Sequence, residues 1–515
     1  MAPEYYELNA KIVDGSTVDA PLNLSADVVI VGSGAGGATM AKELAEAGME
    51  VVLLEEGRYY DHRNYPRSAL EAFMQLYREQ GATASLGKPP ISMPVGRTVG
   101  GTTTINSGTC FRTPDHVMLR WSVLQQLPDL DPTSMGPLFE RVEKIIHAHE
   151  LPREVWGNNA LVVERGAKQL GLTVKPLVHN NENCRGCGTC AIGCPDGAKR
   201  AANTTYVPLC IKAGGKVVSS ARVEQIEIAN GRAVGVSGSL LSEDGLEVRG
   251  ELRVRAPLVI IACGTLHTPV LLKRNKLGKQ SGQLGRNLTV HPAVRVLAVM
   301  DEEVKSWIGV PQGTYIDDFK SDGIMFEGIA VPPALGAPVL PYIGQQYKEL
   351  MGNYANVSTY GVMISDTATG RVLNSRNRPL SLYKMSRQDV RRVLRGVGVL
   401  ARIYFAAGAK SVYTGVAGLP QIKPDQVRLF ERTDPDPMRL ESMAFHPLGT
   451  ARIGVSREES VSDPYGELWD VKGLFAVDGG MVPSSLGVNP MVTIMALATR
   501  SAQYIAAQRA KWISS

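Results

Sequence analysis

One short segment near the N-terminus limits the fold of this chain more than any other feature of its sequence. Residues 27–31 (Asp-Val-Val-Ile-Val) are typical of a buried β-strand, and residues 32–37 (Gly-Ser-Gly-Ala-Gly-Gly) follow without a break. Apolar residues then recur at helical spacing, and residues 50–54 (Glu-Val-Val-Leu-Leu) are typical of a second strand. This order predicts a βαβ unit, in which a glycine-rich turn and a helix N-terminus hold a pyrophosphate.

The glycines and an acidic residue of this unit predict the kind of ligand. Gly32, Gly34 and Gly37 form the pattern G-x-G-x-x-G. Glu55 closes the second strand, at the position where an acidic side chain binds ribose hydroxyls. A flavoenzyme that also binds a nicotinamide cofactor normally carries a second fingerprint, and this sequence has one. We therefore predict that the chain binds FAD alone.

A run of cysteines predicts a second redox group. Four of the seven cysteines lie within eleven residues, at Cys184, Cys187, Cys190 and Cys194. Bacterial ferredoxins hold an iron–sulfur cluster by this spacing, whereas structural zinc usually takes two separated pairs and disulfides are typical of small secreted domains. We predict a cluster ligated by these four thiolates, with a loop that binds nothing as the remaining alternative. The number of irons, four or three, stays open, as does completion of the ligand set by a distant cysteine: Cys110, Cys210 or Cys263.

Composition excludes several classes of protein. A chain of 515 residues with 44% hydrophobic and 20% charged residues is ordinary for a globular protein of two or more domains. The net charge of +5 is spread along the chain, so no nucleic-acid interface is predicted. The longest apolar runs fall short of the about 20 residues that cross a bilayer, and the first residues lack a secretory signal. We expect a cytoplasmic protein without a transmembrane segment; peripheral membrane association and export with a signal-bearing partner subunit stay open.

Five further motifs follow in order along the chain, at residues 96–106, 264–272, 284–292, 445–450 and 488–490. They read GRTVGGTTTIN, GTLHTPVLL, LGRNLTVHP, FHPLGT and VNP. With them the chain resembles the glucose-methanol-choline (GMC) family of flavin oxidoreductases, from about residue 27 to the C-terminal helix. The resemblance implies an α/β fold, α+β overall, with a Rossmann-like FAD-binding domain of the glutathione-reductase type and an antiparallel-sheet substrate domain.

The order of the motifs also implies a domain organisation in which each domain is built from separate segments. The FAD-binding domain is expected to take residues 20–113, 195–298 and 435–515, the last with the C-terminal part of the active site. The substrate domain is expected to take residues 114–194, which include the cysteine loop 184–194, and residues 299–434.

The resemblance assigns roles to individual residues. His446 stands where the family places its active-site base, and Asn489 stands where a partner donates a hydrogen bond to the alcohol oxygen. His291 is equally well explained as a structural hydrogen-bonding residue. The first signature has no histidine, so FAD is expected to bind noncovalently. The expected cofactor contacts are Gly32, Gly34, Gly37, Glu55, Arg97, Gly100, Gly101, Thr102, Asn106, Asp478, Gly479 and Asn489, with the carboxylate of Asp478 presented to the flavin.

The cysteine run and residues 365–372 are most similar to the long-chain fatty alcohol oxidase branch of the family. We therefore predict an FAD-dependent dehydrogenase that oxidises an apolar, long-chain or aromatic alcohol by hydride transfer. Electrons would leave through the cluster to an external cytochrome, quinone or other redox protein. The proline- and glycine-rich residues 328–344 are expected to form a lid or tunnel wall, or a loop packed on the core. An oxygen-using alcohol oxidase, an FAD-containing lyase and a noncatalytic redox sensor are the alternatives.

Overall fold

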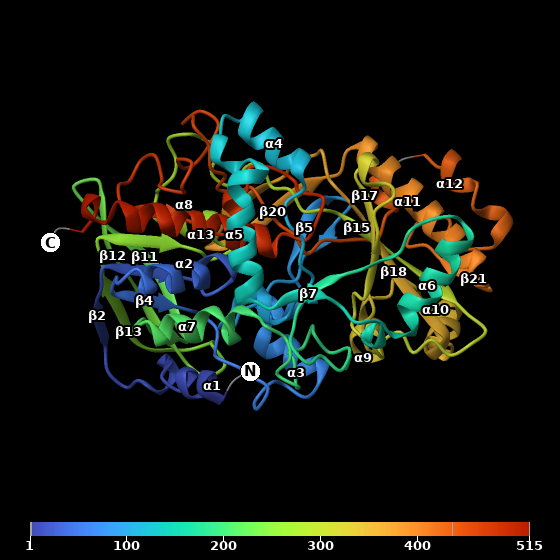
Figure 1. Ribbon diagram of the computed structural model, residues 1–515, viewed down its shortest axis with the longest axis horizontal. Coiled ribbons are helices and arrows are strands. Elements are labelled where there is room, and N and C mark those ends of the chain that lie inside the picture. Colours follow the sequence, from blue (N-terminus) through green and yellow to red (C-terminus); the bar gives the residue numbers. More distant parts are fainter. Residues whose placement is uncertain (1–2, 435, 514–515) are drawn as a thin grey trace.

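The computed structural model describes residues 3–434 and 436–513, which form two regions side by side along the longest axis (Figure 1). The region on the left of Figure 1 combines N-terminal, middle and C-terminal segments, coloured blue, green and red. The region on the right is built mainly from the yellow and orange segments, between about residues 290 and 440. Segments far apart in the sequence therefore meet in both regions.

A parallel sheet of six strands forms the centre of the first region. Its short strands are continuous apolar runs because both faces are covered, and alternate residues face opposite layers. Val28 and Ile30 join the core on the helix side, whereas Val29 and Val31 join the core on the other side. In spatial order the strands are β1 (Val13–Asp14), β10 (Lys216–Ser219), β4 (Val51–Leu54), β3 (Val28–Val31), β14 (Leu258–Ile261) and β24 (Leu474–Ala476).

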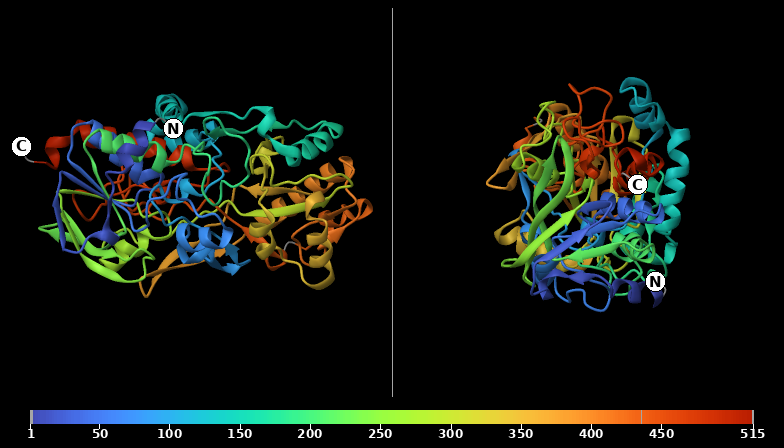
Figure 2. Two further views of the ribbon diagram at one scale, coloured as in Figure 1. Left: turned by 90° about the horizontal axis from the view of Figure 1, so that it is seen from below. Right: turned by 90° about the vertical axis from the view of Figure 1, so that its left-hand side faces the viewer.

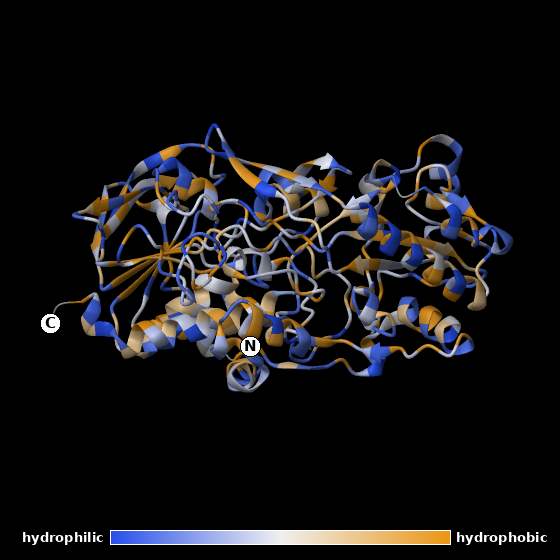
Figure 3. Ribbon diagram, turned by 90° about the horizontal axis from the view of Figure 1, so that it is seen from above, coloured by the Kyte–Doolittle hydropathy of each residue, from blue (hydrophilic) through white to orange (hydrophobic). Residues whose placement is uncertain are grey.

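Helices cover one face of this sheet and a second sheet covers the other. The helix layer contains α2 (Ala35–Glu46), which packs against α7 (Tyr206–Lys212) and α13 (Met491–Ala507). The second sheet lies on the opposite side, as the end view in Figure 2 shows. Its order is β11 (Ala221–Ala229), β12 (Arg232–Leu241), β13 (Val248–Arg255) and β2 (Leu22–Ser25). Figure 3 shows the apolar strands converging inside this region. The predicted Rossmann-like layer is confirmed.

The second region is organised around a mainly antiparallel sheet of twelve strands. Its central strands pack against α11 (Arg387–Ala406), which also contacts α6 (Gly157–Gln169). The principal order is β19 (Arg371–Ser375), β20 (Arg378–Lys384), β5 (Ala84–Lys88), β6 (Ile91–Ser92), β23 (Ser442–Met443), β15 (Ala293–Val299), β18 (Val357–Ile364), β17 (Ile324–Gly328), β16 (Thr314–Ile316) and β8 (Lys175–Pro176). The hairpin of β21 (Ser411–Tyr413) and β22 (Gln421–Ile422) extends from β15.

Shorter elements complete the chain. The strands β7 (Ala148–Glu150) and β9 (Val178–Asn180) form a separate pair. The remaining helices are α1 (Pro3–Asn9), α3 (Ala69–Leu76), α4 (Asp115–Leu124), α5 (Pro132–Ile145), α8 (Thr268–Arg274), α9 (Pro333–Gly336), α10 (Gly344–Gly352) and α12 (Leu429–Arg432). Within the described residues, none of the helices combines the length and the apolar composition that a membrane crossing requires.

The domain intervals expected from sequence stay predictions, but the sheets do not follow them everywhere. Strands β5 and β6, inside the interval 20–113 assigned to the FAD-binding domain, join the twelve-stranded sheet. Helix α5, inside the interval 114–194 assigned to the substrate domain, packs against α13 of the first region. Strand pairing and helix packing between distant parts of the chain decide to which region β5, β6 and α5 belong, and intervals along the sequence do not describe such contacts.

Candidate active site and cofactor cavity

A cavity of about 1710 Å³ is lined by residues from both regions. Pockets for a single small ligand usually enclose about 300–1000 Å³, so this one has room for a dinucleotide together with a substrate. The glycine-rich turn after β3 lines one part of the cavity, and the two histidines His291 and His446 line another. Except for Gly37 and Gly100, the sequence-predicted cofactor and catalytic residues therefore border one space.

The glycines of the first turn divide into packing positions and a cofactor position. A Cβ atom on Gly36 would lie 2.1 Å from the Val477 carbonyl oxygen, and one on Gly37 would lie 1.8 Å from the Gly32 carbonyl oxygen. A Cβ atom on Gly34 would meet no protein atom closer than the Gly101 Cα at 4.0 Å. Gly36 and Gly37 thus bring α2 against the neighbouring chain, whereas Gly34 leaves space in the cavity at the helix N-terminus, as a pyrophosphate requires.

Glu55 lies at the end of β4 and borders the cavity, as the ribose-binding position requires. Its carboxylate accepts hydrogen bonds from the Ser33 backbone N–H at 2.9 Å, the Ser33 hydroxyl at 2.7 Å and the Gly57 N–H at 2.9 Å. Burial raises the pKa of Glu55, and these hydrogen bonds oppose the increase. The carboxylate therefore also fixes the glycine-rich turn against β4.

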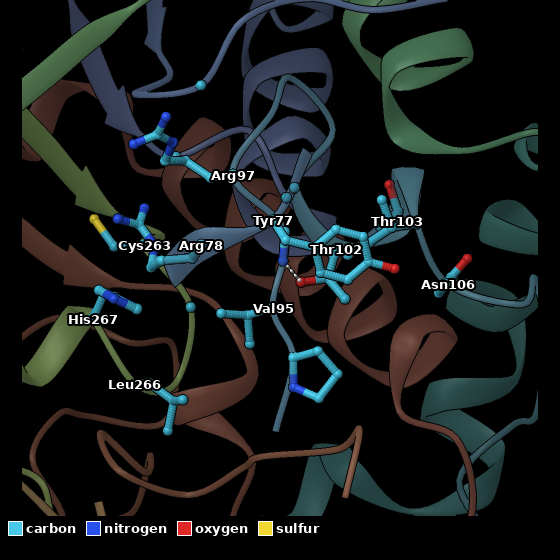
Figure 4. A pocket seen from close by; sticks show the side chains of 18 of the residues that line it. Tyr77, Arg78, Val95, Arg97, Thr102, Thr103, Asn106, Cys263, Leu266 and His267 are labelled. Carbon is cyan, nitrogen blue, oxygen red and sulfur yellow. Dashed lines mark hydrogen bonds between the residues drawn. The ribbon is translucent and has the colours of Figure 1, made fainter. Parts of the chain in front are cut away.

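The first family signature provides another wall of the cavity. Figure 4 shows Arg97 on the opposite side of the pocket from Asn106, with Thr102 between them. Arg97, Gly101, Thr102 and Asn106 all line the cavity. Gly100 does not; its N–H donates to the Ser33 hydroxyl at 2.9 Å, and its φ of 93° suits glycine. The role of Gly100 is thus to position the turn.

The C-terminal turn after β24 also reaches the cavity, at Asp478 and Gly479. The Asp478 carboxylate accepts from the Gly264 N–H at 3.0 Å, the Thr268 hydroxyl at 2.5 Å and the Gly480 N–H at 2.6 Å. Sequence analysis expected this carboxylate to face the flavin, but both of its oxygens are bound by protein donors. Its observed contacts hold the turn, and burial raises its pKa.

Two imidazoles lie together in the cavity. The rings of His291 and His446 are 5.4 Å apart and nearly perpendicular. His291 Nε2 accepts hydrogen bonds from the N–H groups of Leu486 at 2.9 Å and Gly487 at 3.0 Å, so its proton is on Nδ1. The structure therefore gives His291, which sequence analysis left undecided, a fixed neutral tautomer at the site.

His446 is in the neutral form, which can accept a proton. Burial lowers the pKa of His446 to about 4, because the charged ring loses its hydration. The imidazole is consequently neutral near pH 7. Its buried Nδ1 has no hydrogen-bond partner among the described residues.

Asn489 lies in the same cavity and contacts a residue that sequence analysis missed. Its side-chain amide donates to Glu327 Oε2 at 3.4 Å, and Gln312 donates to the same oxygen at 3.1 Å. Burial raises the pKa of Glu327 to about 7, against the effect of the Asn489 hydrogen bond. An acidic residue inside the apolar run Ile-Met-Phe-Glu-Gly of β17 was the available signal for this position.

The four cysteines of the run line one small cavity of their own. All are free thiols, and two sulfurs accept backbone hydrogen bonds, Cys184 from Gly186 N–H and Cys194 from Lys199 N–H, both at 3.4 Å. Within residues 3–434 and 436–513, no three His, Cys, Asp or Glu side chains are arranged to hold a single metal ion. This finding does not support the predicted iron–sulfur cluster, which stays a prediction.

Lys199 connects the cysteine cavity with the first family signature, residues 96–106. The side chain is 5% exposed, and its ammonium group donates to the carbonyl oxygens of Thr104 at 2.6 Å, Asn106 at 2.8 Å and Cys190 at 2.9 Å. Burial lowers the pKa of Lys199, and negative charge on the cysteines would raise it. In the described part of the chain, no carboxylate forms an ion pair with this ammonium group.

Residues 328–344 serve two purposes. Ile329, Ala330 and Val331 line the large cavity, as expected of a tunnel wall. Farther along, Leu340 and Tyr342 are buried in a separate hydrophobic cluster, as expected of a packed loop. Both alternatives from the sequence therefore describe part of this segment.

Comparisons with known proteins match one family over most of the chain. The family description GMC oxidoreductase matches residues 73–293 and residues 367–498. The description NAD(P)-binding Rossmann-like domain matches residues 30–60, which contain the glycine-rich turn.

Individual proteins are similar over nearly the whole chain. The GMC-type oxidoreductase Rv0492c of Mycobacterium tuberculosis is 37% identical over 94% of this chain and 76% of its own. The long-chain-alcohol oxidase FAO1 of Arabidopsis thaliana is 28% identical over 92% of this chain and 66% of its own. Pyridoxine 4-oxidase from Mesorbium loti has a similar structure, with a TM-score of 0.70 and 18% identity over 93% of this chain and 98% of its own.

Proposed function

The chain belongs to the GMC family of flavin oxidoreductases, and on that premise we propose that it is an alcohol dehydrogenase that oxidises an apolar alcohol with noncovalent FAD. One observation carries the proposal: His446, His291 and Asn489 line the same cavity as the glycine-rich dinucleotide turn. FAD bound at that turn would supply the hydride acceptor. The chain's own residues would supply the base and the hydrogen-bond donors that alcohol oxidation requires.

The side chains fit distinct parts of this reaction. His446, neutral near pH 7, accepts the hydroxyl proton of the alcohol. Asn489 has a second amide hydrogen available beyond the one donated to Glu327, and it holds the alcohol oxygen. His291 cannot accept a proton at Nε2, because two backbone N–H groups already bind that atom. Its Nδ1–H serves as a donor in the site.

Apolar wall residues support an apolar substrate. Ile329, Val331 and Met363 line the same cavity as His446 and Asn489. A hydrocarbon chain gains about 0.8 kcal/mol for each methylene group that it buries there. Similarity to the long-chain-alcohol oxidase FAO1 points to the same class of substrate.

We further propose that electrons leave through an iron–sulfur cluster at the four cysteines, to a cytochrome, quinone or other redox protein. Among the described residues no carboxylate pairs with the buried ammonium group of Lys199, which supports this proposal, since a buried cation favours a nearby anion and thiolate-ligated clusters are anionic. The backbone N–H groups that donate to Cys184 and Cys194 would also donate to cluster-ligated thiolates. Free thiols and a cluster also favour a reducing compartment, so the cytoplasm is our proposed location.

The deciding experiment is an anaerobic absorbance spectrum with parallel iron and sulfide analysis. We expect bound flavin, iron and sulfide, and loss of the flavin absorbance on addition of a long-chain or aromatic alcohol. Flavin without iron, together with peroxide formed in air, would favour the alcohol oxidase. Flavin that no alcohol reduces would favour the lyase and refute the proposal.

Lys199→Met tests the cluster through its redox potential. Loss of the positive charge should disfavour the more negative reduced cluster, so we expect its potential to become more negative by about 59 mV or more, a tenfold change in a one-electron equilibrium. The measurement is a redox titration followed by electron paramagnetic resonance. Lys273→Met is the matched control, because it removes an ammonium group that donates to the Val372 carbonyl outside the cysteine cavity. An unchanged potential in an iron-loaded variant would refute this role of Lys199.

A further inference from the structure

A buried carboxyl group interrupts the apolar wall of the active site. Glu327 is 6% exposed, and its backbone is held on both sides, by pairing with Gly361 of β18 and Tyr315 of β16. The residue lines the large cavity together with His446 and Asn489. Its position is therefore fixed by the centre of the twelve-stranded sheet.

The two oxygens of this carboxyl group differ. Oε2 accepts hydrogen bonds from Gln312 Nε2 at 3.1 Å and from Asn489 Nδ2 at 3.4 Å. Oε1 is buried and has no hydrogen-bond partner among the described residues. No Lys, Arg or His side chain in the described ranges forms an ion pair with Glu327.

The donors on Oε2 are themselves held in orientation. Gln312 Oε1 accepts from the Thr109 hydroxyl at 2.6 Å, which leaves the amide nitrogen of Gln312 for Glu327. The Gln312 backbone carbonyl is 2.7 Å from the His179 ring nitrogen Nε2. This chain of polar groups holds Oε2 on its protein donors and leaves the buried Oε1 without one among the described residues.

A buried polar atom without a hydrogen-bond partner destabilises the folded protein. The neighbouring wall provides no compensation, because Ile329 and Met363 are apolar. A ligand that donates to or accepts from Oε1 would remove this penalty. A hydroxyl group does both, so it suits the neutral and the ionised carboxyl group alike.

We propose that Oε1 of Glu327 binds a second hydroxyl group of the substrate, so that the enzyme prefers diols to monohydric alcohols of the same chain length. This inference rests on the proposed alcohol oxidation. Glu327 accepts a hydrogen bond from Asn489, the residue proposed to bind the alcohol oxygen that reacts. The second hydroxyl group is therefore close to the carbon that is oxidised, as in a 1,2-diol, and the apolar wall contacts the remaining chain.

The test compares 1,2-octanediol with 1-octanol in the FAD-loaded enzyme. We expect the wild type to have the higher kcat/KM with the diol, and Glu327→Leu to lose that preference by about 10- to 100-fold. Glu327→Gln retains a hydrogen-bonding side chain and should keep most of the preference. Glu441→Gln is the matched control, since Glu441 is a carboxyl group that does not line the cavity and whose pKa burial likewise raises to about 7.

The ratio of the two substrates separates this role from a structural one, because misfolding lowers both rates together. An equal ratio in the wild type and in Glu327→Leu would overturn the inference. If neither alcohol reduces the flavin, the proposed function fails, and the dissociation constant of the diol, measured through the flavin absorbance, still decides the role of Glu327. Equal constants for the wild type and Glu327→Leu would overturn it, whereas weaker binding by Glu327→Leu alone would support it.

Discussion

Replacement of His446 by alanine is expected to lower the rate constant of flavin reduction by about 10²- to 10⁴-fold, the usual contribution of a general base. The FAD content should not change, because the residues expected to bind FAD lie in the glycine-rich turn and the first signature. These are parts of the cavity wall other than the one that contains His446. Neither His291 nor Asn489 can replace the lost base. His291 already accepts two hydrogen bonds at Nε2, and an amide is not basic near pH 7.

Anaerobic stopped-flow absorbance measures this rate constant directly. The exposed His116 supplies the matched control, since His116→Ala removes an imidazole from the surface. In the wild type the pKa of about 4 leaves His446 neutral above about pH 5, so protonation of His446 should lower the rate constant only below about pH 5. A His446→Ala rate within threefold of wild type would exclude His446 as the base.

Local sequence predicted the parts of the site that depend on local structure. The glycine-rich turn, Glu55 and the helix N-terminus lie in one βαβ unit, whose strand and helix patterns are continuous in the chain. His446 and Asn489 were predicted because each lies in a short family motif. In these cases the residues that define the structure are near each other in sequence.

The missed residues depend on contacts across the chain. Glu327 and Gln312 are brought to Asn489 by strand pairing, which no local pattern describes. Lys199 follows Cys194 closely, but its role depends on Thr104 and Asn106, nearly a hundred positions earlier. Sequence alone therefore predicted the proposed reacting groups more readily than the groups that would position them.

Gly34→Val is expected to prevent FAD binding in a protein that still folds. Gly34 has φ −69° and ψ −166°, which any residue adopts, and an added Cβ would meet no protein atom closer than 4.0 Å. The new side chain would instead occupy the space at the α2 N-terminus, where a bound pyrophosphate would accept backbone hydrogen bonds. Hydrogen bonds to charged groups contribute about 1.5–3 kcal/mol each, so loss of two should weaken FAD binding by at least about 100-fold.

Flavin absorbance of the purified variant and thermal unfolding of the flavin-free protein separate binding from folding. Gly136→Val is the matched control, because Gly136 lies in α5 with no atom within 4 Å of an added Cβ, and it should retain FAD. Gly36→Val should behave differently from both, since its Cβ would lie 2.1 Å from the Val477 carbonyl oxygen and would disrupt the packing of α2. Stoichiometric FAD in Gly34→Val would mean that the pyrophosphate does not lie at this turn, whereas an unfolded Gly34→Val would mean that Gly34 is a packing position like Gly36.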